Sequence, residues 1–202
     1  MNIQWLGNSC FRIETKHHGE PVDMVIDSYK PANGDFPRNL STNIALFTHG
    51  ADGTVTLSDE PMVIETPGEY ETKGIFIYAY PVASGLIFYF ESEQVTCAHL
   101  GYVNKELTDK ELELVGEADI LMVPVGGGDA ADASTAVKIV TQIEPRIVIP
   151  MCYHSAAGET WDKLEKFSKA LGLPGVTPDK KFKVTKKELP EEETKLVIIE
   201  RS

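Results

Sequence analysis

Short apolar runs separated by turn-forming residues fill the first hundred positions of the chain. The runs are rich in β-branched and aromatic residues, and Gly, Pro, Asn or Asp lie between them: IQWLG, CFRIET, VDMVIDS, NIALFT, MVIET, GIFIYAY, LIFYFES and QVTCAHL. Segments of this kind favour β-strands, so the pattern predicts a series of strands. KHHGEP, between the second and third runs, predicts a hairpin turn with His17 and His18 at an exposed tip.

After residue 105 the pattern changes to apolar strands that alternate with amphipathic helices. Thr108 and Glu111 have the spacing of a capping box, so a helix is predicted to begin there. ADILMVPV and RIVIPM are continuous apolar runs and predict buried strands. DASTAVKIVTQI repeats apolar residues every three or four positions, as one face of a helix requires. These residues are Ala133, Ala136, Val137, Val140 and Ile143.

A further helix is predicted over ETWDKLEKFSKALG, residues 159–172. Trp161, Leu164, Phe167 and Leu171 fall on one of its faces, and Gly172 is expected to end it. FKVTKK and KLVIIE are predicted to close the chain as strands. Strands followed by alternating helices and strands indicate layered sheets with helices outside. The pattern therefore predicts an α/β or α+β fold, with one domain over residues 1–202.

The composition is that of an ordinary soluble globular protein. A chain of 202 residues favours one domain, and 42% hydrophobic with 25% charged residues is a usual balance. The longest apolar-rich stretch runs from Ile75 to Phe90 and is interrupted by Pro81, Ser84 and Gly85. It is shorter than the roughly 20 residues that span a bilayer, so no membrane association is expected.

Cysteine usage and the first residues favour a cytoplasmic protein. Cys10, Cys97 and Cys152 are far apart and form no CxxC pair, which favours reduced thiols over a disulfide framework. MNIQWLGNSCF lacks the basic segment and the apolar core of a secretory signal.

The net charge argues against nucleic acid as a partner. Thirty-one acidic and nineteen basic residues give a net charge of −12, and an acidic chain repels phosphate backbones. The single basic cluster, Asp179 to Lys187, alternates lysines with apolar residues. We interpret it as the solvated face of a strand, with a binding patch as the alternative.

The segment LFTHGADG contains the clearest candidate for chemistry. His49 follows an apolar strand predicted over Ile44 to Thr48, and small residues and Asp52 come after it. A histidine at the end of a buried strand, followed by small residues and an acid, is typical of a metal site. A catalytic zinc site needs about three protein ligands and an open position for water. Further ligands must therefore come from other parts of the chain.

Several segments together resemble a known family. WLGNSCFRIET, MVIDSY, IALFTHGADG, ETPGEYETKGIFIYAYP, AHLGY and GEADILMVPVGGG, with IEPRIVIPMCYH after them, occur in the order and spacing of the metallo-β-lactamase superfamily. The resemblance covers Ile3 to His154 and is closest to the small metal-dependent hydrolase branch similar to ascorbate-6-phosphate lactonase. It implies an αββα four-layer sandwich whose active site lies at one edge, where strand ends deliver the metal ligands.

The resemblance also implies that most of the family's dinuclear metal site has been lost. Of the family's His-x-His-x-Asp-His signature only the first histidine remains, as His49, and Asp52 is one residue out of register. The other positions that match family ligands carry different residues. These are Asn8, Ala51, Gly53, Thr54, Tyr102 in place of the acid that bridges two metals, and Cys152 in place of the last histidine.

Two interpretations of the remaining donors stay open. In one, His49 and Cys152, together with His99 or His154, form a rebuilt mononuclear site, since thiolate and imidazole both suit zinc. In the other, Cys152 is a small buried apolar residue, and His49 and His99 are hydrogen-bonded within the core. Asp27 either orients the ligands from outside or caps its own loop, and Asp52 is a second candidate for the orienting role.

The function predicted from these residues is non-hydrolytic. We expect a binding or interaction protein with a small-molecule or protein partner, a homodimer being one option, and with no resident cofactor beyond zinc at low occupancy. The alternative is a metal-dependent hydrolase of a small ester, lactone or phosphorylated metabolite that uses the rebuilt mononuclear site.

Overall fold

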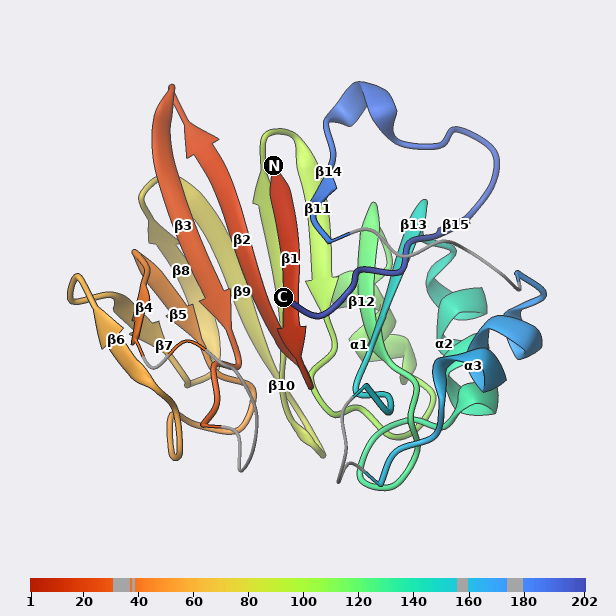
Figure 1. Cartoon of the computed structure of the whole chain (residues 1–202). Coiled ribbons are helices and arrows are strands. Elements are labelled where there is room, and N and C mark those ends of the chain that lie inside the picture. Colours follow the sequence, from red (N-terminus) through yellow and green to blue (C-terminus); the bar gives the residue numbers. More distant parts are fainter. Residues whose placement is uncertain (31–36, 38, 156–159, 174–179) are drawn as a thin grey trace.

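Two β-sheets packed face to face form the body of the protein (Figure 1). The computed structural model describes residues 1–30, 37, 39–155, 160–173 and 180–202. The first sheet has the order β14-β1-β2-β3-β5-β7. Its strands are β1 (Asn2–Gly7), β2 (Cys10–His17), β3 (Glu20–Ile26), β5 (Ile44–Leu46), β7 (Met62–Ile64) and β14 (Phe182–Lys183). The predicted hairpin is confirmed, because β2 pairs with β3 from Phe11–Ile26 to His17–Glu20.

The second sheet has the order β15-β13-β12-β11-β10-β9-β8. Its strands are β8 (Gly68–Thr72), β9 (Ile75–Val82), β10 (Gly85–Ser92), β11 (Val95–His99), β12 (Ile120–Pro124), β13 (Ile147–Met151) and β15 (Lys195–Leu196). A third, two-stranded sheet pairs β4 (Asn39–Ser41) with β6 (Thr56–Ser58). Parallel pairing of β11, β12 and β13 brings their carboxyl ends to one edge of the second sheet.

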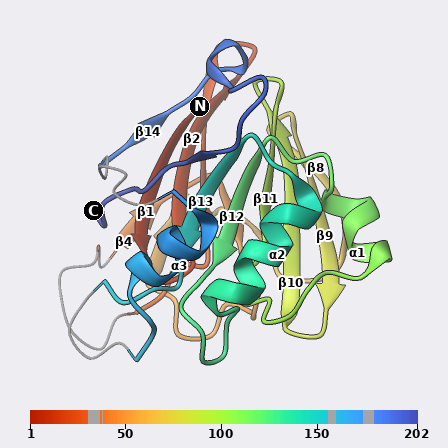
Figure 2. The same ribbon diagram turned by 90° about the vertical axis from the view of Figure 1, so that its right-hand side faces the viewer.

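Three α-helices lie over the outer face of the second sheet (Figure 2). They are α1 (Asp109–Val115), α2 (Ala133–Ile143) and α3 (Leu164–Leu171). Strands β12 and β13 are buried at every position, because the first sheet covers one face and the helices cover the other. Strand β9 alternates buried positions with more exposed ones, so its outward side chains are only partly covered. The two packed sheets that the resemblance implied are confirmed. The αββα expectation placed a helical layer on each outer face, but the α-helices among the described residues cover the second sheet alone.

The helix boundaries partly match the prediction. The capping box is confirmed, with Thr108 and Glu111 bonding each other's backbone at the start of α1. Helix α3 is shorter than predicted and begins at Leu164, while residue 159 lies outside the described residues. Trp161 precedes the helix, because its indole N–H donates to Asp129 and the neighbouring backbone bonds the loop after β12. Gly172, in the left-handed conformation, ends α3 as predicted.

Several predicted strands are shorter in the structure, among them KLVIIE, of which only β15, Lys195–Leu196, forms a strand. The strand predicted over Ile44 to Thr48 ends at Leu46, because Thr48 turns toward Asp27. The basic segment forms only two paired residues before a short 3-10 helix, Lys186–Glu188. Two of its lysines make ion pairs within the chain, Lys181 with Glu14 and Lys186 with Asp119, so its interpretation as a purely solvated face was incomplete. Residue 179 lies outside the described residues.

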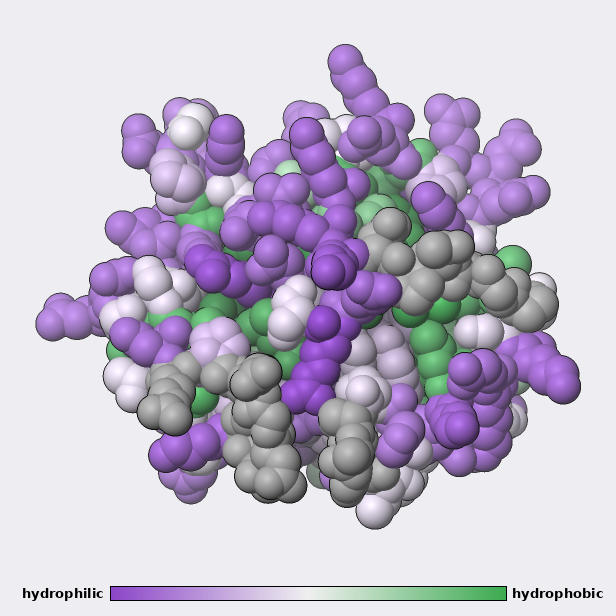
Figure 3. All heavy atoms as spheres, viewed as in Figure 1, coloured by the Kyte–Doolittle hydropathy of each residue, from purple (hydrophilic) through white to green (hydrophobic). Residues whose placement is uncertain are grey.

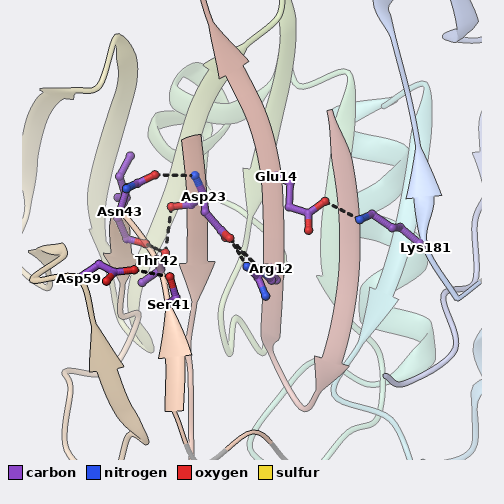
Figure 4. A network of polar contacts seen from close by, with 9 residues as sticks. Arg12, Glu14, Asp23, Ser41, Thr42, Asn43, Asp59 and Lys181 are labelled. Carbon is purple, nitrogen blue, oxygen red and sulfur yellow. Dashed lines mark hydrogen bonds and ion pairs between the residues drawn. The ribbon is translucent and has the colours of Figure 1, made fainter. Parts of the chain in front are cut away.

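The outer face of the first sheet is polar (Figure 3). Arg12 on β2 pairs with Asp23 on β3, and Glu14 reaches Lys181 beside β14 (Figure 4). Burial raises the pKa of Asp23 and the Arg12 guanidinium opposes that rise. Ion pairs near the surface contribute about 0–1 kcal/mol each, so the network joins strands without dominating stability. Within the described ranges, no helix has the length and apolar character needed to cross a bilayer.

The capping box of α1 gives a direct test of this fold. We expect Thr108→Ala to lower the free energy of unfolding by about 1 kcal/mol, because it removes the side chain that accepts from the Glu111 amide. Thr141→Ala, at an exposed position in the last turn of α2, is the matched control and is expected to be neutral or slightly stabilising. Urea titration of both variants measures the difference. Equal effects at the two positions would contradict the assigned cap.

Candidate functional site

The predicted site residues lie in loops at one end of the two sheets (Figure 1). Asn8 follows β1, Asp27 follows β3, Tyr102 follows β11 and Cys152 follows β13. Backbone hydrogen bonds tie these loops together across the sandwich. The Cys152 amide donates to the Asn8 carbonyl at 3.0 Å, and the Leu86 amide donates to the Thr48 carbonyl at 2.9 Å. This end of the molecule is the edge that the resemblance predicted for a site.

Asp27 orients the loop that carries His49. Its carboxylate accepts from the Thr48 amide and from the Thr48 hydroxyl, both at 2.7 Å. The Thr48 hydroxyl also lies 2.9 Å from Nδ1 of His49. Since the hydroxyl proton goes to Asp27, the hydroxyl oxygen accepts from Nδ1–H, and Nε2 of His49 keeps its lone pair. Asp27 therefore holds the loop that follows β5 and orients His49 through Thr48. These hydrogen bonds go to Thr48 rather than to the loop after Asp27 itself, and the predicted role of orienting metal ligands stays a prediction.

His49 is exposed, so the expectation that it is packed within the core was wrong. Its ring lies edge-to-face on Tyr102, with ring centroids 4.7 Å apart. Gly85 makes room for this loop: a Cβ there would lie 2.3 Å from the Thr48 carbonyl oxygen. Asp52 is also exposed, in the turn between Ala51 and Gly53, and does not take the orienting role that Asp27 takes.

His99 is completely buried and links the two sheets. Its Nε2 lies 2.9 Å from the Ser9 carbonyl, and its Nδ1 is 3.2 Å from the Gly101 amide nitrogen. Because the Gly101 amide can only donate, Nδ1 accepts and Nε2–H donates to Ser9. Burial lowers the pKa of His99, which keeps the ring neutral. Both ring nitrogens are therefore committed, as the prediction of a hydrogen-bonded core histidine required.

Tyr102 occupies the space between these groups. Its hydroxyl bonds the side chain of Ser9, and its ring lies against His49 and, with centroids 6.5 Å apart, Trp161. Burial raises the pKa of the Tyr102 phenol well above its usual value, and the nearby Cys152 raises it further. The phenol is therefore uncharged where the resembling family carries a metal-bridging carboxylate.

Cys152 and His154 take separate positions after β13. Cys152 is buried, with a left-handed backbone, under the loop that follows β12. His154 is partly buried and lines a neighbouring pocket of about 410 Å³ with Trp5 and Arg201. Within the described residues, no three His, Cys, Asp or Glu side chains come together as a metal-binding group. The structure thus does not unite His49, His99, Cys152 and His154.

These donors do not fit a catalytic zinc centre. Such a centre needs about three ligands with available lone pairs and an open position. The one lone pair of the His99 ring, on Nδ1, is already engaged by the Gly101 amide, and Nε2–H donates to Ser9. Tyr102 presents a neutral phenol at the position where the resemblance expects an anion. Among the four candidates, His49 is the exposed residue whose ring is oriented by a carboxylate through Thr48.

Sequence reasoning missed three residues that shape this site. Ser9 is buried and bonds both His99, through its carbonyl, and Tyr102, through its side chain. Thr48 connects Asp27 to His49, and Glu65 accepts from the Ala51 amide at 3.0 Å to hold the loop after His49. None of these three residues belongs to a motif that would have indicated its role. Tyr102, by contrast, carried a sequence signal, because a large aromatic ring stands there in place of a small acid.

The fold and the loop cluster define a protein of the metallo-β-lactamase class. A family model described as "Beta-lactamase superfamily domain" matches residues 2–152, so the chain belongs to this superfamily. A UPF0173 metal-dependent hydrolase of Nanoarchaeum equitans is 32% identical over 195 residues, which cover 77% of this chain and 85% of that protein. A UPF0173 protein of Pyrococcus abyssi is 29% identical over 188 residues, 78% of this chain and 86% of its own.

Solved structures carry the same architecture. A metallo-beta-lactamase superfamily protein of Thermotoga maritima superposes with a TM-score of 0.80 at 25% identity and covers 98% of both chains. The Ignicoccus hospitalis metallo hydrolase Igni18 has a TM-score of 0.63 at 18% identity and covers 91% of this chain and 99% of its own, which shows the fold alone.

The buried His99 predicts a pH dependence of stability. Its pKa is lowered in the folded state, whereas an unfolded histidine titrates near about 6.5. As the pH falls, the unfolded chain therefore takes up a proton at this histidine before the folded protein does. The stability that the neutral His99 contributes is complete above the pKa of the unfolded histidine. It decreases as the pH falls below that pKa, by at most about 1.4 kcal/mol per pH unit.

His99→Gln tests this dependence. The variant is expected to be less stable at pH 7, because one of the two hydrogen bonds is lost, but to lose less additional stability between pH 7 and pH 5 than the parent protein. Denaturant titrations at each pH measure both slopes. Identical slopes would show that His99 is not a buried neutral imidazole.

Proposed function

We propose that this protein is a non-hydrolytic binding protein built on the metallo-β-lactamase fold. The observation that carries the proposal is the uncharged Tyr102 phenol, hydrogen-bonded to Ser9 and packed on His49, at the centre of the strand-end loops. A bulky ring in this place excludes the volume that a metal and its water need. A neutral phenol also lacks the carboxylate oxygens that the resemblance expects as metal ligands at this position.

Other nucleophiles near the loops do not supply hydrolysis either. Ser9 is buried, and its hydroxyl bonds Tyr102 rather than a base. Cys10 is buried, and desolvation together with Asp27 raises the pKa of its thiol well above the usual range. A protonated, buried thiol is a poor nucleophile. The groups that a ligand would meet at this edge are the His49 imidazole and the Tyr102 ring, which bind by hydrogen bonding and aromatic contact.

A metal-dependent hydrolase with a rebuilt mononuclear site is the second candidate. It is favoured by two observations: relatives carry the name metal-dependent hydrolase, and His49 is an exposed residue whose ring is held in place through Thr48 and Asp27. In this candidate His49 would be a ligand, and a bound metal would activate water. The donors near it would have to rearrange, since His99 is committed to Ser9 and Gly101.

Metal content separates the two candidates. The purified protein is expected to carry well under one equivalent of zinc, iron or manganese per chain, because one exposed imidazole does not hold an ion tightly. Elemental analysis after gel filtration in metal-free buffer measures this content, with a dinuclear metallo-β-lactamase handled in parallel as the control. One or more tightly held ions per chain would refute the binding-protein proposal.

Reversion of the motif tests how far the site is from function. Cys152→His alone is expected to give neither zinc binding nor ester hydrolysis, because Tyr102 still fills the centre. The combined variant changes five positions at once: Ala51→His, Gly53→Asp, Thr54→His, Tyr102→Asp and Cys152→His. It is expected to bind zinc more tightly than either the parent or the single variant. Calorimetric titration with zinc and an aryl-ester assay provide the readouts, and strong turnover from the single change would contradict the proposal.

A further inference from the structure

Strand β9 presents aromatic side chains on the face that points away from the core. Its inward positions are Ile75, Ile77 and Ala79, all buried. Its outward positions are Phe76, Tyr78 and Tyr80, and Phe76 is 50% exposed. The outer face of an antiparallel sheet that meets water is normally polar, so three successive aromatic residues there call for a partner.

Two of these tyrosines join a third from β10 along the edge of α1. Tyr78 stacks on Tyr80, with ring centroids 6.1 Å apart and planes at 11°. Tyr89 lies opposite Tyr78 across the strand pair, also with centroids 6.1 Å apart. With Leu112 and Leu114 of α1 they line a pocket of about 530 Å³. We call this pocket the tyrosine groove; its other lining residues are Glu113, Gly116 and Glu117.

The charged residues that line the tyrosine groove within the described part of the chain are both negative. Glu113 and Glu117 line it, and no lysine, arginine or histidine appears among its described lining residues. Glu69 on β8 lies opposite Tyr78. Burial raises the pKa of Tyr80 and Glu69 raises it further, while burial and Glu117 act in the same direction on Tyr89. The phenols are thus kept neutral in a field that repels anions.

We propose that the tyrosine groove binds a lysine or arginine side chain on a basic segment of a partner protein. Aromatic ring faces attract cations through the ring quadrupole, and arginine and lysine are the side chains that use this contact. The surrounding glutamates add charge complementarity at the rim. A purely apolar occupant would desolvate Glu113 and Glu117 without pairing them, and a nucleic acid would be repelled by the same carboxylates.

This inference is independent of the binding role proposed for the strand-end loops. The tyrosine groove is formed by β9, β10 and α1, whereas Tyr102 and His49 lie in loops that follow β11 and β5. Substitutions in the groove leave Ser9, His99 and Tyr102 untouched. Failure of one proposal is therefore distinguishable from failure of the other, because metal content reports only on the loops.

Fluorescence anisotropy with a labelled oligo-arginine peptide and a labelled oligo-lysine peptide tests the proposal, with oligo-glutamate as the negative probe. Measurements are made at about 150 mM salt, where exposed charges that lie more than roughly 8 Å apart are largely screened from one another. Both basic peptides are expected to bind, and oligo-glutamate is not. Tyr80→Leu is expected to weaken the binding about fivefold, whereas Tyr80→Phe, which keeps the ring, is expected to change it less than about twofold.

Two variants with the same charge change separate the groove from general attraction to an acidic protein. Glu113→Gln with Glu117→Gln is expected to weaken peptide binding about fivefold or more. Glu192→Gln with Glu193→Gln, exposed residues near the C-terminus, is expected to change it less than about twofold. Circular dichroism confirms folding of each variant, and the Tyr80→Phe protein keeps the test decisive if Tyr80→Leu unfolds.

Three outcomes would overturn the proposal. The first is equal weakening by the two glutamine pairs, which would mean diffuse attraction by the net charge. The second is a loss of binding in Tyr80→Phe as large as the loss caused by the groove glutamines, which would mean that the ring face is not the contact. The third is a parent protein that binds neither basic peptide but forms a dimer in sedimentation experiments, with the dimer weakened by Tyr80→Phe or by the two glutamine substitutions in the groove. That result would assign the groove to a second copy of this chain.

Discussion

A neutral imidazole buried between the two sheets holds the strand-end loops in place. His99 donates to the Ser9 carbonyl of the first sheet and accepts from the Gly101 amide of its own loop. Ser9 in turn bonds the Tyr102 hydroxyl, so the positions of the central ring and of the turn after β1 depend on the same histidine. A charged or metal-bound imidazole could not make both contacts. The internal hydrogen bonding of this edge therefore competes directly with metal ligation.

The second constraint is the small space at the centre of the loops. Gly85 brings β10 close to Thr48, and Thr48 is fixed by two hydrogen bonds to Asp27. Tyr102 fills the interior that these loops enclose and packs on His49, which stays exposed at the mouth. In the function proposed here, this packing and hydrogen bonding take the place of a metal centre at the edge of the sandwich. The relation to relatives named metal-dependent hydrolases is one of family and fold.

Much of the fold could be predicted from the sequence, because periodicity and capping residues are local signals. The strand pattern, the start of α1 at Thr108 and the end of α3 at Gly172 follow from them. The start of α3 could not be predicted in this way, because Trp161 donates a hydrogen bond to Asp129, a contact that only the tertiary structure creates. The same limit applied to the site. The resemblance to a motif indicated which positions differ from the family's ligands. The tautomer of His99, however, depends on Ser9 and Gly101, and the orientation of His49 depends on Thr48, and none of these three residues belongs to a motif.

The tautomer of His99 in the presence of zinc tests the central claim most directly. Nitrogen-15 NMR of the imidazole rings distinguishes an Nε2–H ring from an Nδ1–H ring and from a metal-bound one. The account predicts that His99 stays in the Nε2–H form and that its resonances do not move when zinc is added in excess, while His49 at most shows weak, fast exchange. An Nδ1–H ring in the free protein, or zinc-induced displacement of the His99 resonances at stoichiometric metal, would contradict it.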